Sequence, residues 1–297
     1  MALEYVTACP ICRSTSYPLL FTAKDYTSTG ESFSIVKCVG CGFVFTNPRP
    51  DQISIGRYYQ SKKYISHSGG SQSLLDRAYI FARRITVRWK LRIISKYRSK
   101  GNALDYGCGT GEFLMKLQSN RWVVTGVEPS VEAREKAFNL LQIPIYPTLE
   151  NIHNSKFDII TLWHVLEHVH DLEKILTSLH SLLNDDGIIF IAVPNHESQD
   201  ATEYKAYWAG YDVPRHLWHF SKNTMKRLLD ISGFCLLETL PMKLDAYYVS
   251  LLSEGYKNPN QNKLIALLKA FTNAFTSNLA AIENQNYSSI IYIAKRR

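Results

Sequence analysis

Beyond residue 101, short apolar runs alternate with stretches in which apolar residues recur at helical spacing. This alternation of strand-length and helix-length patterns predicts a parallel sheet covered by helices on both faces. The strands are expected near residues 102–106, 122–127, 143–146, 157–163, 187–193, 235–240 and 288–294. Asn184–Gly187 has the composition of a turn leading into the fifth of these strands. The sequence therefore predicts an α/β fold with a doubly wound, seven-stranded, mostly parallel sheet.

Two further helices are indicated, one before this alternating region and one within it. From about Leu74 to Arg98, apolar residues recur near helical spacing and predict a long amphipathic helix that leads into the sheet. A second helix is expected from Ser221 to Ile231, with Ser221 as its N-cap and Gly233 just past its end.

The last two strands are separated by a helical insertion at about residues 245–285. Its most apolar stretch, Leu264 to Ile282, is interrupted by polar residues, which fits an amphipathic or partly buried helix pair. A peripheral membrane role is a minor alternative. Because Met1–Glu4 does not open a leader pattern and no uninterrupted apolar run approaches bilayer length, we expect no integral membrane segment and a cytoplasmic location.

Four of the six cysteines occur as two closely spaced pairs. Cys9 and Cys12 form one pair, Cys38 and Cys41 form the other, and two such pairs can complete a tetrahedral sulfur shell around zinc. Because a closed four-thiolate shell has no open position for water, the expected role of the zinc is structural. Four reduced, buried cysteines are the alternative.

Charge and composition divide the chain into three parts. Residues 1–100 hold 16 Lys/Arg against 5 Asp/Glu, although the whole chain has a net charge of only +8. We predict a zinc ribbon at 1–50, a linker or lid with a basic amphipathic helix at 51–100, and the sheet domain at 101–297. The basic helix either attracts phosphates or an acidic partner, or is a solvated face.

A glycine-rich turn joins the first predicted strand to the following helix. Gly107, Gly109 and Gly111 come after Asp105, and glycines in such a turn let backbone amides approach a ligand closely. The dinucleotide fingerprint needs glycine at the position of Glu112, so this G-x-G-x-G spacing departs from nicotinamide and flavin folds. The spacing favours S-adenosylmethionine as the ligand.

A second acidic residue lies at the end of the second predicted strand. Glu128, which precedes Pro129, can accept hydrogen bonds from both ribose hydroxyls of the same cofactor. Ser130 would then cap the next helix. The two acids, the glycines and the helix reinforce one another, whereas the glycines alone would fit an ordinary tight turn.

Two groups of histidines follow predicted strands, at the sheet edge where open parallel sheets bind ligands. After the fourth strand, His164, Glu167 and His168 would share one helical side, and either histidine can act as a general base. The alternative is that Glu167 and His168 only cap the next helix and bond neighbouring loops.

The second group lies in the segment Asp212–Phe220. Here Arg215 is expected to bind an acidic group of the acceptor, while His216 or His219 orients or deprotonates it. A structural role for these residues is the alternative.

The glycine loop, Asp105 and Glu128 resemble class I S-adenosylmethionine-dependent methyltransferases, specifically the branch of ubiquinone-biosynthesis O-methyltransferases and bacterial zinc-ribbon methyltransferases. The resemblance spans nearly the whole chain and implies a Rossmann-like fold. It implies cofactor contacts from Asp105, Tyr106, Gly107, Cys108, Gly109, Gly111, Glu112, Glu128, Pro129, Leu149, Trp163 and His164. Ubiquinone-type relatives bind a divalent metal through Glu-x-x-Glu-His. Because His164 stands at the first of these positions, a softer metal site is the alternative to a general base.

These patterns lead to three hypotheses about function. The preferred one is methylation of a small molecule, such as a sugar, glycan or lipid precursor, at oxygen or carbon. A second is RNA methylation, with the ribbon and the basic helix binding a phosphate backbone, although the ribbon itself is not basic. A third is a non-catalytic scaffold that binds the cofactor.

Overall fold

The structure is a computed structural model that describes residues 2–59, 74–153 and 155–297, and for residues 74–84 the backbone alone. The Ser-Gly-Gly-Ser part of the predicted linker or lid therefore lies outside the described residues. So do the side chains of the first arginines of the predicted basic helix.

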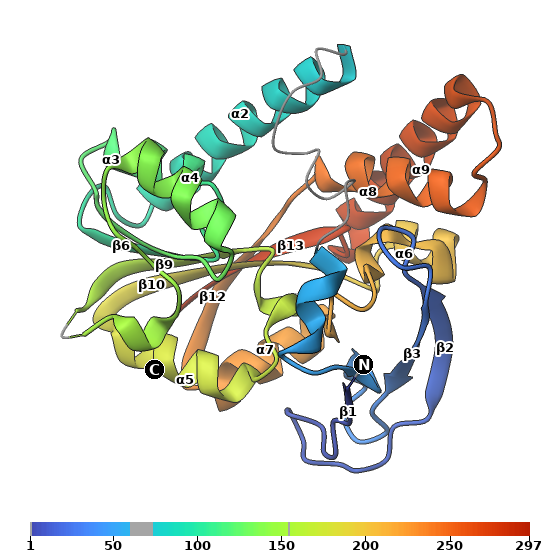
Figure 1. Cartoon of the computed structure of the whole chain (residues 1–297), viewed down its shortest axis with the longest axis horizontal. Coiled ribbons are helices and arrows are strands. Elements are labelled where there is room, and N and C mark those ends of the chain that lie inside the picture. Colours follow the sequence, from blue (N-terminus) through green and yellow to red (C-terminus); the bar gives the residue numbers. More distant parts are fainter. Residues whose placement is uncertain (1, 60–73, 154) are drawn as a thin grey trace.

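A seven-stranded sheet forms the centre of the larger domain (Figure 1). Its order is β8-β7-β6-β9-β10-β13-β12, with β13 antiparallel to both neighbours and the four contacts from β8 to β10 parallel. The strands are β6 Asn102–Tyr106, β7 Val123–Val127, β8 Ile145–Tyr146, β9 Phe157–Trp163, β10 Leu183–Pro194, β12 Phe234–Pro241 and β13 Ser289–Arg296. The predicted seven-stranded, mostly parallel sheet is confirmed.

The predicted turn at Asn184–Gly187 is wrong, because these residues lie inside β10. The strand begins at Leu183, which pairs with Phe157 of β9, and its register shifts before Ile188. The polar run is thus the irregular part of a longer strand, and pairing with β9 outweighs the local turn preference.

Helices cover both faces of this sheet, as predicted. The helices are α2 Leu74–Ser95, α3 Glu112–Gln118, α4 Val131–Leu141, α5 Leu172–Leu182 and α7 Lys222–Ile231. On one face α2 and α3 pack on alternate strand residues such as Ile159, whereas α5 and α7 pack on the other set, which includes Ile160. Ser221 caps α7 in a capping box and Gly233 follows its end with a φ of 82°, as predicted.

A four-stranded antiparallel sheet forms the N-terminal part of the molecule. Its order is β11-β4-β3-β2, with β2 Leu19–Lys24, β3 Ser32–Lys37, β4 Val44–Thr46 and β11 Trp218–His219. A short ribbon of β1 Leu3–Glu4 and β5 Arg49–Pro50 lies beside it. Because β11 comes from the predicted histidine-rich segment, the larger domain completes the sheet of the N-terminal part.

The region predicted as a helical insertion, about 245–285, holds two helices, α8 Asp245–Lys257 and α9 Lys263–Asn284. They pack against each other and against α6 Gln199–Tyr204. Short 3₁₀ helices complete the description: η1 Ser54–Tyr59, η3 Leu149–Asn151, η4 Leu166–His168, η5 Lys205–Tyr207 and η6 Ala209–Tyr211.

Candidate active site

The glycine loop follows β6 and has the backbone that only glycine adopts readily. Gly107, Gly109 and Gly111 all have positive φ, of 77°, 55° and 83°. A Cβ at Gly107 would lie 2.4 Å from a methyl group of Val165, whereas one at Gly109 would meet no atom within 4 Å. The middle glycine therefore faces open space, which suits the close approach of a ligand to its backbone.

Glu128 joins this loop to the end of β7. One carboxylate oxygen accepts a hydrogen bond from the Gly109 amide at 2.9 Å, and the other accepts one from the Ser130 amide at 2.9 Å. Each carboxylate oxygen has a second lone pair, so Glu128 can still accept hydrogen bonds from a bound diol. Ser130 caps α4, as expected, through the amide of Ala133.

Asp105 lies at the carboxyl end of β6 and is almost fully buried. The hydroxyl of Thr161 donates a hydrogen bond to its carboxylate at 2.6 Å. Burial raises the pKa of Asp105 to about 7, with Glu128 adding to the shift, while Thr161 and Lys90 oppose it. A cationic group brought next to Asp105 would stabilise its carboxylate form.

Other residues predicted to contact the cofactor surround this loop. Tyr106 follows Asp105, and burial together with Glu150 and Glu128 raises its pKa to about 12. Cys108 and Leu149 are buried, Glu112 opens α3, and Pro129 is exposed after Glu128.

Trp163 ends β9 with an indole NH that is buried and lacks a hydrogen-bond partner in the described part of the chain. The ammonium of Lys90, from α2, lies 4.2 Å from the centre of a Trp163 ring. The sequence reasoning placed Lys90 only among basic helix residues and missed this contact.

His164 follows β9 with a φ of 57°, an uncommon conformation for a residue other than glycine. Its Nε2 lies 2.9 Å from a carboxylate oxygen of Asp245, and its Nδ1 lies 3.3 Å from Glu167. Burial favours the neutral ring, but the two carboxylates outweigh it and raise the pKa of His164 to about 10. At neutral pH His164 is therefore an imidazolium that links β9 to the first residue of α8.

Glu167, His168 and His216 form a separate cluster whose metal-binding atoms all lie within 4.8 Å of one another. The helical arrangement predicted for His164, Glu167 and His168 is only partly present, since η4 spans Leu166–His168 and His164 precedes it. Thus His216, from the other predicted segment, joins Glu167 and His168 in place of His164.

The proton positions in this cluster follow from its hydrogen bonds. Nδ1 of His168 lies 3.0 Å from the carbonyl of Arg215, and Nδ1 of His216 lies 2.8 Å from the carbonyl of Gly210. Because a carbonyl only accepts, both Nδ1 atoms carry a proton, and the Tyr59 hydroxyl also lies 3.0 Å from Nδ1 of His168. In a neutral ring protonated at Nδ1, Nε2 keeps its lone pair. Burial and the neighbouring His216 lower the pKa of His168 to about 4, so its ring is neutral.

Glu167 contributes the charge of the cluster. Its side chain is fully buried, and its Oε2 has no hydrogen-bond partner among the described residues. Burial opposes ionisation, but His164 holds the pKa of Glu167 below its usual value. A buried carboxylate oxygen beside two imidazole rings suits either a proton or a divalent metal ion.

Arg215 does not lie where the sequence analysis expected it. Its side chain is fully buried and donates hydrogen bonds to both carboxylate oxygens of Asp212, to Asp25 at 3.1 Å and to the carbonyl of Tyr58 at 3.0 Å. The guanidinium is thus occupied by protein groups and joins the N-terminal part to the larger domain. This arrangement favours a structural role over recognition of an acidic acceptor.

His219 is also buried rather than open to a pocket. It belongs to β11, and its Nε2 lies 3.1 Å from the hydroxyl of Thr46 in β4. That hydroxyl donates to the carbonyl of His216, so Nε2 of His219 must donate to Thr46. Burial lowers the pKa of His219 far below its usual value, which again favours a structural role.

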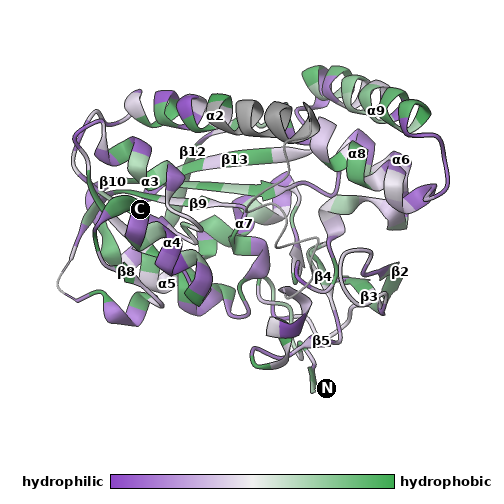
Figure 2. Ribbon diagram, turned by 45° about the horizontal axis from the view of Figure 1, so that its top comes forward, coloured by the Kyte–Doolittle hydropathy of each residue, from purple (hydrophilic) through white to green (hydrophobic). Residues whose placement is uncertain are grey.

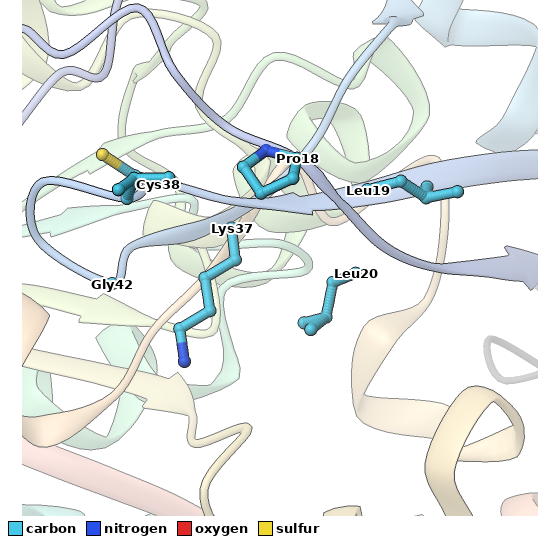
Figure 3. Close-up of a pocket in the computed structure, with 7 residues that line it drawn as sticks. Pro18, Leu19, Leu20, Lys37, Cys38 and Gly42 are labelled. Atoms are coloured by element: carbon cyan, nitrogen blue, oxygen red, sulfur yellow. The ribbon is translucent and has the colours of Figure 1, made fainter.

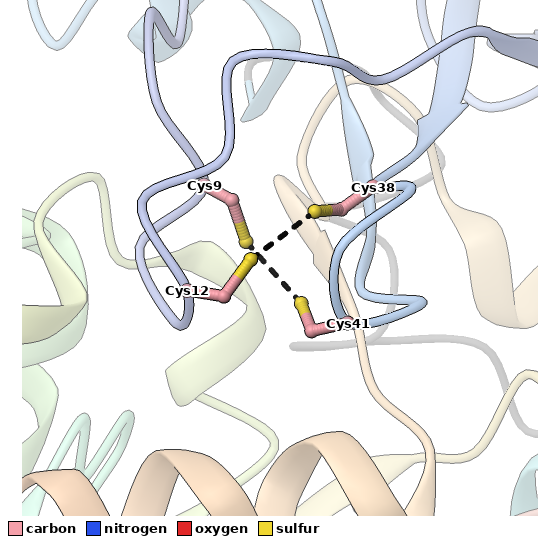
Figure 4. A group of neighbouring side chains, drawn as sticks. All are labelled: Cys9, Cys12, Cys38 and Cys41. Carbon is pink, nitrogen blue, oxygen red and sulfur yellow. Dashed lines mark hydrogen bonds between the residues drawn. The ribbon is translucent and has the colours of Figure 1, made fainter.

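The four cysteines predicted to bind zinc converge at one point (Figure 4). The Cys9 and Cys41 sulfurs are 3.5 Å apart, and those of Cys12 and Cys38 are 3.4 Å apart. Sulfurs about 3.8 Å apart would surround a tetrahedral zinc ion with bonds of about 2.3 Å. A Cβ at Gly40 would lie 3.0 Å from the Cys12 sulfur, which explains the glycine there. The cluster fits a zinc ribbon.

A shallow hollow of about 260 Å³ lies on the N-terminal part of the molecule (Figure 3). Its lining includes Pro18, Leu20, Lys37 and Cys38, but the Cys38 sulfur points away from the Leu20 and Lys37 side chains. Since none of the glycine-loop residues lines it, this hollow is separate from the candidate cofactor site.

The strand order and the glycine loop at the end of β6 together define the class I, S-adenosylmethionine-dependent methyltransferase fold. Residues 77–239, more than half of the chain, match the family model described as "Methyltransferase domain". The chain belongs to this methyltransferase family.

Curated relatives agree with this assignment. The ubiquinone biosynthesis O-methyltransferase of Glaesserella parasuis serovar 5 (strain SH0165) is 33% identical over 109 residues, which cover 32% of this chain and 46% of that protein. The protein of the same name from Coxiella burnetii (strain Dugway 5J108-111) is 27% identical over 160 residues, covering 44% and 66%. This chain thus matches about half the length of such relatives.

Solved structures share the fold at low sequence identity. The magnesium protoporphyrin IX methyltransferase (ChlM) from Synechocystis PCC 6803 with bound SAH matches with a TM-score of 0.53 and 15% identity, over 83% of this chain and 100% of that one. The StiE O-MT structure (residues 961–1257) matches with a TM-score of 0.51 and 14% identity, over 76% and 78%.

Proposed function

We propose that the protein transfers a methyl group from S-adenosylmethionine to a small-molecule acceptor, such as a sugar, glycan or lipid precursor. The glycine loop carries this proposal, because its open middle glycine is bonded to Glu128 and the loop follows the buried Asp105. When bound, the cofactor would supply an already activated methyl group, so the protein's main task is positioning.

Asp105 and Glu128 would hold opposite ends of this cofactor. Asp105 is suited to the cationic amino group of the methionyl part, because a positive charge relieves the cost of burying its carboxylate. Glu128 is held in place by the Gly109 and Ser130 amides and would accept from the ribose hydroxyls. Trp163 has a buried indole NH that could donate to a bound group.

His168 and His216 would act on the acceptor. Nδ1 of each ring faces a carbonyl, so Nε2 of a neutral ring can take the proton from an acceptor hydroxyl or carbon as the methyl group arrives. His164 is unsuited to this task at neutral pH because it is protonated between Asp245 and Glu167. It would instead position Glu167.

The same cluster also has the donor set for a divalent metal ion, through Glu167, His168 and His216. Metal analysis of protein purified without chelator separates the alternatives. One equivalent of metal in addition to zinc, which His216→Ala no longer contains, would favour a metal-binding role of the cluster over a role as general base alone.

Titration calorimetry with S-adenosylmethionine tests the cofactor part of the proposal. Glu128→Ala should weaken binding about tenfold or more, since two charge-assisted hydrogen bonds are lost. Glu132→Ala is the matched control, because Glu132 lies on α4 and, among the described residues, pairs with the exposed Lys136. If the wild type did not bind S-adenosylmethionine, the proposal would be contradicted.

Release of S-adenosylhomocysteine with a panel of small acceptors tests the chemical part. His168→Ala and His216→Ala should each lower turnover about 100-fold while cofactor affinity stays within twofold. Wild-type turnover in the double variant would remove this cluster from the mechanism. An acceptor that proves to be RNA would instead support the alternative drawn from the zinc ribbon and basic helix.

A further inference from the structure

Helix α9 packs on the protein through small residues and exposes its large ones. Its buried residues are Ala270, Ala274, Ser277 and Ala281. The opposite side carries eight exposed large apolar residues: Leu264, Ile265, Leu267, Leu268, Phe271, Phe275, Leu279 and Ile282. A helix that serves only to cover a core has the reverse distribution.

The exposed side forms one continuous apolar stripe, because these residues recur at spacings of three and four. Phe271 is 59% exposed and Leu268 is 60% exposed. Eight large side chains that are about half exposed present on the order of 700 Å², more than a soluble monomer usually shows in one patch. Figure 2 shows this apolar colouring along α9.

The neighbouring helix α8 also exposes apolar residues. Leu244, just before α8, and Tyr248 and Leu251 within it are also exposed, at the spacing of one helix side. The α8–α9 hairpin, residues 245–284, therefore presents apolar side chains from both helices.

Basic residues border this apolar surface. Lys263 and Lys269 are exposed on α9, whereas Glu283 is its one acidic residue. Helix α2 lies along the same edge of the molecule in both views and exposes Arg88, Arg92 and Lys96 (Figures 1 and 2). Within the hairpin itself the charges balance, since Asp245, Glu254 and Glu283 oppose Lys257, Lys263 and Lys269. The excess positive charge along this edge therefore comes from α2.

We propose that the α8–α9 hairpin docks flat on an anionic lipid bilayer, with the α9 stripe buried among the acyl chains and the lysines at the headgroups. This combination of a large apolar side and flanking cations is what interfacial helices use. A second copy of the chain would bring two equally basic edges together, which disfavours it as the occupant.

By length and composition alone, α9 is the one helix among the described residues that could cross a membrane. Its alanine and serine side is packed against α6 and α8, so a spanning arrangement would require those contacts to break. Flat docking keeps them and buries only the exposed side.

Docking would also place the candidate active site beside the bilayer. Asp245, the first residue of α8, bonds His164 at the end of β9. If the proposed methyl transfer is correct, the acceptor would carry a lipid chain that stays in the membrane while its head group enters the site.

Sedimentation of the full chain with vesicles tests the docking independently of activity. Vesicles of phosphatidylcholine with about one third phosphatidylglycerol should carry the protein down, and pure phosphatidylcholine vesicles should bind it about tenfold more weakly. Leu268→Ser with Phe271→Ser should weaken binding at least about tenfold. The matched control is Ile53→Ser with Val131→Ser, two residues that are 92% and 61% exposed outside the hairpin.

A charge reversal examines the basic border in the same assay. Lys263→Glu with Lys269→Glu should weaken binding about tenfold at low salt, whereas Lys226→Glu with Arg227→Glu, on α7, should not. Melting temperatures of all variants confirm that each remains folded.

Several outcomes would overturn the proposal. One is that the wild type does not sediment with vesicles. The same conclusion would hold if, in addition, light scattering showed a dimer that Phe271→Ser converts to monomers, because the stripe would then be a dimer interface. Another is equal binding of the hairpin variants and their controls. Equal binding to both vesicle types would overturn the assignment of an anionic surface. Vesicle binding without turnover of any acceptor would contradict the proposed function but leave the docking intact.

Discussion

Asp105 and Arg215 are both buried ionisable residues, but their surroundings act on the charge in opposite ways. Asp105 receives one hydrogen bond from Thr161 and its pKa is raised by burial, so its ionised form costs stability at neutral pH. Arg215 has two carboxylate partners and a carbonyl, which keep it charged. A buried acid with few hydrogen-bond partners indicates a binding site for a cation. A buried cation whose donors are all bonded to protein groups indicates a structural contact.

Asp105→Asn should therefore stabilise the protein without cofactor and impair its cofactor binding. The pKa of Asp105 is raised to about 7, so the carboxyl contributes stability below pH 4 and loses it as pH rises through 7. At pH 8 the variant should melt a few degrees higher than the wild type, and at pH 5 the difference should shrink. Calorimetry should show S-adenosylmethionine affinity at least about tenfold lower. A variant that melts at the wild-type temperature at pH 8 would contradict the account.

Arg215→Ala should destabilise the protein by about 3–5 kcal/mol, because it leaves the buried Asp25 without its cationic partner. Denaturant unfolding measures this change. Lys136→Ala, which removes an exposed pair with Glu132, should change the free energy of unfolding by less than about 1 kcal/mol. A folded Arg215→Ala variant with normal stability and lost acceptor turnover would instead restore the acceptor-binding role predicted from the sequence.

At the scale of elements, the histidine after β9 connects the sheet to the helical insertion. His164 lies between Glu167 of η4 and Asp245 of α8, so its charge holds the start of α8 against the strand end. The same contact fixes Glu167, whose other oxygen faces the cluster with His168 and His216. The protonation state of one ring therefore affects how two elements fit together.

Stability should fall at alkaline pH because of this ring. The pKa of His164 is raised to about 10 in the folded protein, so its contribution is fully present below pH 6.5 and is lost as pH rises through 10. Allowing for its partial exposure, the loss is on the order of 2 kcal/mol, or roughly 5 °C in Tm. His164→Gln should flatten the Tm profile between pH 7 and 10. An unchanged slope in this variant would show that His164 is not the titrating group.

How far the sequence predicts these elements depends on the range of the interactions involved. The strands of the seven-stranded sheet, the capped α7 and the glycine loop are local patterns, and the sequence predicts them within a few residues. The short strands β1 to β5 of the N-terminal part were not predicted. The sequence does not predict the start of β10, because Leu183 joins the strand through its pairing with Phe157 of β9, which is not a neighbour in the sequence. The two-residue β11 is too short to show any periodicity.

The candidate site was predicted unevenly for the same reason. Residue type and position after a strand singled out Glu128, His168 and His216, but they did not distinguish these from the buried Arg215 and His219. Asp245 was missed as a partner because its contact with His164 joins residues 81 positions apart. The sequence offered one indication of this contact, namely that Asp245 is an acid at the first position of the predicted insertion.

On the scale of the whole molecule, the N-terminal part and the methyltransferase domain are joined through shared structure. β11 pairs with β4, Arg215 bonds Asp25, and Trp218 stacks on Phe43 with ring centres 5.7 Å apart. The domain boundary at residue 50 stays a prediction, and the N-terminal sheet takes its fourth strand, β11, from the later chain. Changes at the cysteine cluster should therefore reach His216, which adjoins β11.

Removal of the proposed zinc should lower both stability and turnover. One zinc per chain is expected by elemental analysis, and Cys38→Ser should lose it. The Tm should fall by roughly 5 °C or more, and turnover should fall while S-adenosylmethionine affinity stays within about threefold, because the glycine loop lies in the other sheet. Cys235→Ser, outside the cluster, is the matched control. Full zinc content in Cys38→Ser would contradict the site.

The pairing of β11 with β4 also sets an order of events during translation. Thr46 and His219 are 173 residues apart, so at about 5–20 residues per second the partner strand emerges from the ribosome roughly 10–30 s after β4. Throughout that interval β4 has a free edge that other chains can pair with. Synthesis of this protein therefore includes a period in which a chaperone that shields strand edges would raise the yield.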